Sequence, residues 1–82
     1  PSRREDAPTL LLGRSSDIEV LLRAIETGAV RNMRPVAILS PREIDLGQVI
    51  RGVKVTGDFA DLDDEVAAAR ARNAPIRRIV MT

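Results

Sequence analysis

The residues best suited to chemistry form a polar turn, Gly13-Arg14-Ser15-Ser16-Asp17-Ile18, which follows three leucines at residues 10–12. A glycine turn between a buried strand and a helix can hold phosphate, because the first backbone N–H groups of the helix point at the anion. Dinucleotide-binding turns have glycine at the first, third and sixth places, which here hold Gly13, Ser15 and Ile18. We therefore expect weakened or altered phosphate binding at residues 13–16; the alternative is a tight turn with a helix cap.

Two more polar turns follow an apolar run at residues 36–39 and a short predicted strand at residues 53–56. After the first run, Ser40 can hydrogen-bond a hydroxyl and Arg42 can meet a phosphate, but the carboxylate that grips an adenine ribose is missing there. We expect poor affinity for unphosphorylated NAD; the alternative interpretation is a turn with a solvated arginine. Gly57 and Asp58 could line the same pocket or simply lead into a helix. The candidate cofactor-binding residues are Gly13, Arg14, Ser15, Ser16, Ser40, Arg42, Gly57 and Asp58.

Composition excludes much other chemistry. The 82 residues include no cysteine, histidine, tyrosine or tryptophan and one phenylalanine, so no thiolate nucleophile, zinc-thiolate site or imidazole base is available. We name no catalytic residue and no metal ligand. A net charge of +1 and the lack of aromatic stacking surfaces argue against nucleic acid as a partner.

Charged clusters are interpreted as structural. The helix dipole favours acids in the first turn of a helix and arginines at its end. It accounts for the acidic cluster Asp58, Asp61, Asp63, Asp64 and Glu65, and for part of the basic set Arg70, Arg72, Arg77 and Arg78, whose other members we assign to a solvated loop.

The elements that position these residues alternate between strand and helix. We expect a linker at residues 1–8 and one domain at 9–82, with buried-type strands at 9–12, 36–39, 53–56 and 79–81. A helix with an apolar stripe should begin at a capping box of Ser16 and Glu19 and end at Gly28. A second helix follows Leu62, and residues 42–52 should be mostly loop, with room for one helical turn. No apolar run is long enough to span a bilayer.

This order predicts a parallel sheet. Right-handed crossovers favour the spatial strand order 3-2-1-4, with ligands at the carboxyl ends of strands one and four, where the winding reverses. The expected fold class is therefore α/β, a small Rossmann-like half-domain of three layers with four parallel strands.

The chain from residue 9 onward also resembles a known family. TLLLGRSSDIEVLLRAI, RPVAILS, GQVIRGVKVTGDFADLDDEV and IRRIVMT are similar to the first Rossmann-like, CoA/NAD-binding-like domain of bacterial polysaccharide-biosynthesis proteins, the membrane-anchored nucleotide-sugar 4,6-dehydratases and epimerases. The most distinctive part is the segment IRGVKVTG at residues 50–57. A related domain occurs in polyprenyl-phosphate sugar transferases.

The resemblance implies a non-catalytic nucleotide-binding-like domain in a parent protein of capsule or O-antigen synthesis. NAD(P) or another nucleotide is the implied cofactor, and the catalytic domain and membrane helices of the parent are the implied partners. The implied location is the cytoplasmic face of the bacterial inner membrane, with the fragment itself soluble. A structural, oligomerisation or ligand-sensing module and the sugar-transferase parent remain alternatives.

Overall fold

Leu10, Leu11 and Leu12 form the centre of the computed structural model, which describes residues 6–82. They belong to strand β1 (Ala7–Leu12), which pairs in parallel with β2 (Met33–Leu39) on one side and β5 (Arg78–Met81) on the other. Neighbours on both edges and layers on both faces bury all three leucines, as expected of a central parallel strand. β1 begins two residues before the expected boundary at Thr9, and residues 1–5 of the predicted linker lie outside the described part.

Strand β2 is longer than the predicted run from Val36, and it contains Pro35, which cannot donate to a sheet ladder. Its pairing with β1 shifts between Thr9 and Leu10, where Val36 is an extra residue on β2. Such a bulge interrupts the ladder locally, so the proline is accommodated inside a strand.

Helix α1 (Ser15–Glu26) starts earlier than its sequence suggests. Arg14 is the N-cap, and no side chain caps the helix. The predicted capping box of Ser16 and Glu19 is therefore wrong, because the early start places Ser16 inside the first turn rather than at the cap.

Residues 42–52 contain the single helical turn for which the prediction left room, and they also contain a strand that was not predicted. A short 3-10 helix, η2 (Glu43–Asp45), is followed by strand β3 (Val49–Ile50), which pairs antiparallel with β4 (Val53–Gly57). The connecting residues Arg51 and Gly52 have φ angles of 46° and 88°, as a two-residue hairpin turn requires. The prediction of an all-parallel, four-stranded sheet is thus wrong in this respect: the sheet has five strands and is mixed, in the order β3-β4-β2-β1-β5.

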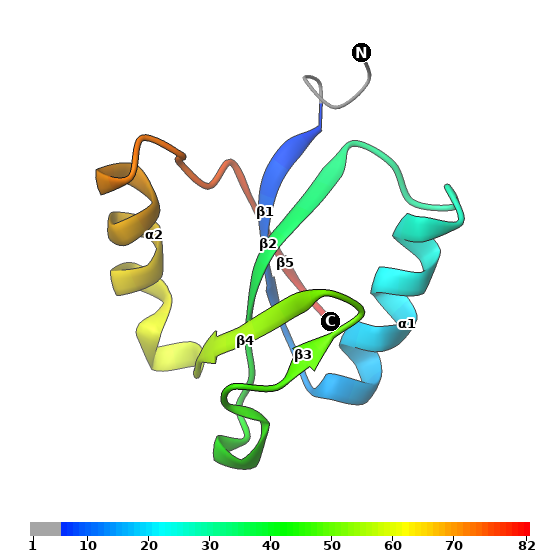
Figure 1. Cartoon of the computed structure of the whole chain (residues 1–82), viewed down its shortest axis with the longest axis horizontal. Helices are drawn as coiled ribbons and strands as arrows, with labels where there is room; N and C mark the ends of the chain where they lie inside the picture. The colour runs from blue at the N-terminus through cyan, green and yellow to red at the C-terminus, as the bar shows by residue number, and fades with distance from the viewer. Residues whose placement is uncertain (1–5) are drawn as a thin grey trace.

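The helices cover opposite faces of the sheet, so the predicted α/β class is confirmed (Figure 1). After β4, the short 3-10 helix η3 (Phe59–Asp61) leads into α2 (Leu62–Ala71), which runs back toward the start of β5. The core on the α1 face consists of Leu11, Ile18, Leu22, Ile38 and Val55. The core on the α2 face consists of Leu10, Leu12, Ala37 and Leu39, with Leu62, Val66 and Ile76 packed against it.

Candidate functional site

The three predicted turns lie in a row at the carboxyl ends of the parallel strands. The N–H of Gly13 donates to the carbonyl of Leu39 at 3.0 Å, and the N–H of Ser40 donates to the carbonyl of Gly57 at 3.0 Å. These two backbone hydrogen bonds join the end of β1 to that of β2, and the end of β2 to that of β4. Residues far apart in sequence therefore share one edge of the sheet.

The first turn presents the start of α1 without a side-chain cap. The first intrahelical hydrogen bond runs from the N–H of Ile18 to the carbonyl of Arg14 at 2.9 Å, so the N–H groups of residues 15–17 precede it. Arg14 and Ser16 are exposed and Ser15 is half-buried. Such a helix start favours an anion, although Asp17 adds a negative charge in the same turn.

Gly13 is buried and lies against the end of the chain. A Cβ at this position would overlap the hydroxyl of Thr82 and contact Ile18. The N–H of Thr82 also donates to the carbonyl of Leu12 at 2.9 Å. The glycine therefore leaves room for the Thr82 hydroxyl, a contact that involves no ligand.

The second turn is organised by a buried hydrogen bond that sequence reasoning missed. Ser40, 1 % exposed, donates from Oγ to Oδ2 of Asp45 at 2.6 Å, and Asp45 is itself 4 % exposed. The Ser40 hydroxyl also accepts from the N–H of Arg42 at 3.1 Å. The Ser40 hydroxyl hydrogen is therefore already bonded to Asp45 and is not available to a ligand. The Arg42 side chain, in contrast, is exposed. Periodicity gave no signal for Asp45, because loop residues carry no repeating pattern.

The third turn is a capping box. The carboxylate of Asp58 accepts from the N–H of Ala60 at 2.8 Å, while the N–H of Asp58 donates to Oδ2 of Asp61 at 2.9 Å. Gly57 is buried beside it, and a Cβ there would overlap the Asp61 carboxylate. Both candidates in this turn therefore have a structural part in starting η3.

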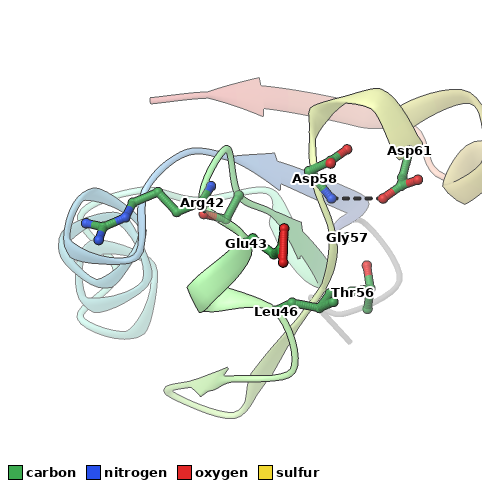
Figure 2. A pocket seen from close by; sticks show the side chains of 8 residues that line it. Arg42, Glu43, Leu46, Thr56, Gly57, Asp58 and Asp61 are labelled. Atoms are coloured by element: carbon green, nitrogen blue, oxygen red, sulfur yellow. Dashed lines mark hydrogen bonds between the residues drawn. The ribbon is translucent and has the colours of Figure 1, made fainter.

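A hollow of about 160 Å³ opens between the second and third turns; its lining residues are Ser40, Arg42, Glu43, Leu46, Thr56, Gly57, Asp58 and Asp61. Figure 2 shows the Arg42 side chain extending away from Asp58 and Asp61. The lining carries three carboxylates and one guanidinium, so the hollow suits a group rich in hydrogen-bond donors better than it suits a phosphate.

Sequence reasoning did not assign Glu43, Leu46 or Thr56 to a site. Thr56 reaches the hollow because the pairing of β2 with β4 shifts between Ile38 and Leu39, which makes Thr56 an extra residue on β4. Glu43 lies three residues after Ser40, which holds the position of the ribose-binding carboxylate in dinucleotide-binding folds. The acidic lining of the hollow has one signal in the sequence, which is that acidic residues follow both β2 and β4.

The acidic cluster does not assemble into a metal site. Across residues 6–82, no three carboxylates are gathered in an arrangement that could hold a metal ion. The cluster starts two successive helices instead, through the capping box and the first turn of α2, which holds Asp63, Asp64 and Glu65.

An ion-pair network on the side of the domain ties the hairpin turn to α1. Nε and one terminal nitrogen of Arg51 each donate to the Glu26 carboxylate at 2.7 Å, and Glu19 lies 3.7 Å from the same guanidinium. The hydrogen bonds from Arg51 lower the pKa of Glu26 below its usual value, and the same bonds raise the pKa of Arg51. This network replaces the predicted capping role of Glu19 with a tertiary contact.

Comparisons of the chain with protein-family models, with curated proteins and with solved structures found no match. The resemblance to polysaccharide-biosynthesis proteins therefore stays a prediction. In the described part of the chain, neither helix has the length and apolar character needed to cross a bilayer.

Proposed function

We propose that this domain is a non-catalytic, Rossmann-like nucleotide-binding module whose ligand lies across the three turns. Support comes from its four parallel strands, in the spatial order β4-β2-β1-β5. Sequence order reverses at β1, and open α/β sheets bind ligands at the carboxyl ends of their strands beside such a reversal. The observation that carries the proposal is the joining of all three turns at that edge by two backbone hydrogen bonds.

Each part of a nucleotide has a favoured place at this edge. The phosphate group fits the uncapped start of α1, where Arg14 and the first N–H groups supply positive charge. The nucleoside fits the hollow, because its amino and hydroxyl groups can donate to carboxylates such as Glu43. The acidic lining disfavours a phosphate in that hollow.

Three residues lead us to expect weak binding: Ser15 and Asp17 in the first turn, and Ser40 in the second. The Ser15 side chain stands where glycine permits close approach of a pyrophosphate, and Asp17 repels it. Ser40 cannot replace the ribose-binding carboxylate because its hydroxyl already donates to Asp45. We therefore expect dissociation constants of about a millimolar, a binding free energy of roughly 4 kcal/mol.

On the resemblance alone, we propose that the parent protein is a membrane-associated nucleotide-sugar dehydratase or epimerase of polysaccharide biosynthesis. In that parent, NAD(P) or a related nucleotide would be the ligand of this domain, and catalysis would belong to an adjoining domain.

An NMR titration of the 82-residue chain with NAD, NADP, CoA and UDP-sugars tests the binding proposal. Saturable amide shifts are expected for at least one nucleotide at Gly13 and Gly57, and Arg14→Glu should weaken the binding. Lys54→Glu has the same change of charge on β4, away from the three turns, and should leave binding unchanged. The absence of shifts at the three turns with millimolar ligand, or equal affinities of the two variants, would refute the proposal.

A further inference from the structure

The near-neutral net charge conceals a separation of charge along the strands. Six arginines lie at the amino end of the sheet, and all six are exposed: Arg31, Arg34, Arg70, Arg72, Arg77 and Arg78. Arg34 is opposite Pro8 at the start of β1, and the N–H of Arg77 donates to the carbonyl of the same proline. Arg70 and Arg72 are brought there by α2, whose end faces the same edge (Figure 1). Two carboxylates lie toward the same end: Asp6, which precedes β1, and Glu26, which ends α1 and is paired with Arg51.

The opposite end of the sheet is acidic. Seven carboxylates lie there, against the two cations Arg14 and Arg42: Asp17, Glu43, Asp58, Asp61, Asp63, Asp64 and Glu65. Glu19, Arg23, Glu26 and Arg51 neutralise one another along α1, and Asp45 is buried. The domain therefore has a basic end and an acidic end, defined by these two sets of residues.

Helix dipoles explain only part of this arrangement. They favour the acids in the first turns of α1 and α2, and the arginines at the end of α2. They do not account for Arg31, Arg34 or Arg77, which lie in loops or a strand, nor for Glu43 beside the hollow. Within residues 6–82, no ion pair holds any of the six arginines at the basic end. Their charge is therefore available to a partner.

We propose that the basic end docks onto the acidic end of a second copy of this chain, in a head-to-tail contact. A polyanion such as RNA or an anionic membrane would satisfy the basic end alone, whereas a second copy satisfies both ends. The chain also lacks aromatic side chains for stacking bases, since its one phenylalanine, Phe59, lies near the acidic end. A head-to-tail contact leaves one end of each kind exposed, so it forms short linear oligomers unless the rotation closes a ring.

The contact should be weak and sensitive to salt. The charges involved are exposed, and interactions between exposed charges are screened beyond about 10 Å at 0.1 M salt. In sedimentation velocity of the full 82-residue chain, we expect concentration-dependent association at an ionic strength of about 20 mM that disappears at about 500 mM.

Two charge reversals make the test specific. By the two sets of residues above, Arg77→Glu/Arg78→Glu lowers the charge of the basic end from +6 to +2, and Asp63→Lys/Asp64→Lys changes that of the acidic end from −5 to −1. Each variant alone should associate about tenfold or more weakly than the unmodified chain, because the altered end keeps only a small part of its net charge and attracts the neighbouring copy less. An equimolar mixture should associate again, because the acidic end of the first variant remains intact and so does the basic end of the second. The mixture should consist mainly of one-to-one pairs, since the two altered ends keep too little charge to extend the chain of copies.

Lys54→Glu is the control, because Val55 lies opposite Ile38 and Lys54 is therefore at mid-sheet, away from both ends. It should leave association within about twofold of the unmodified chain. Far-UV circular dichroism confirms that each variant is folded. A monomer at every concentration in low salt, or reversals that leave association unchanged, would overturn the proposal, as would a mixture that fails to pair. Binding of the arginines to anionic vesicles or RNA by a chain that stays monomeric would also overturn it.

Discussion

Removing the Ser40 hydroxyl directly tests how the second turn is built. Its Oγ lies 2.6 Å from Oδ2 of Asp45, and both residues are buried. In Ser40→Ala the Asp45 carboxylate stays buried without this donor, and the N–H of Arg42 loses its acceptor. A hydrogen bond to a charged group contributes about 1.5–3 kcal/mol, so the free energy of unfolding should fall by about 2 kcal/mol.

Urea denaturation of Ser40→Ala, Asp45→Ala and the double variant completes the measurement. For a domain of this size, a 2 kcal/mol loss corresponds to a Tm lower by roughly 8–16 °C. The double variant should be at least about 1 kcal/mol more stable than the sum of the single effects predicts, because it leaves no carboxylate without its donor. A loss below about 0.5 kcal/mol in Ser40→Ala, or strictly additive effects, would refute this account of the turn.

Three further substitutions test other parts of the structure. Ser16→Ala should change the unfolding free energy by less than about 0.5 kcal/mol. Loss of a helix-capping serine lowers that free energy by about 0.5–2 kcal/mol, so a decrease of that size would support the capping box after all. Gly57→Ala should cost about 1–3 kcal/mol in urea denaturation, and clearly less in an Asp61→Ala background; equal costs would contradict the overlap. Arg51→Met should lower the Tm at pH 7. The lowered pKa of Glu26 means that the ion pair stabilises the fold above 4.5, the usual value, and that this stabilisation is lost as the pH falls through the lowered pKa. The Tm difference should therefore vanish in strong acid, and a constant difference would exclude this origin.

The buried strands could be predicted because burial on both faces produces runs such as Leu10 to Leu12 without alternation. Strand β3 could not be found in this way, because two residues are too few to show a period. A signal was nevertheless present, since the Arg51-Gly52 pair between two β-branched segments is compatible with a hairpin turn. The predicted start of α1 was wrong because Ser16 and Glu19 match the sequence pattern of a capping box. In the structure Glu19 pairs with Arg51 instead.

The sequence was sufficient to predict that the candidate residues lie together at the carboxyl ends of the strands. Parallel strands must bring their carboxyl ends to one edge, so the clustering of Ser40 with Gly57 follows from the order of the elements. The hollow itself depends on contacts between loop side chains and on the extra residue Thr56 in β4, and neither has a sequence period.

Gly13 and Gly57 show why glycine at the end of a strand is weak evidence for a ligand. Both have a structural explanation, because a side chain would overlap the Thr82 hydroxyl at one and the Asp61 carboxylate at the other. The start of α1 is different, because the extended backbone of Arg14, with φ −73° and ψ 153°, suits a serine cap that would add about 1 kcal/mol. Arg14→Ser should therefore raise stability and, by occupying an N–H group of the first turn, weaken nucleotide binding in the same titration. If stability rises while binding is unchanged, the anion does not lie at this helix start.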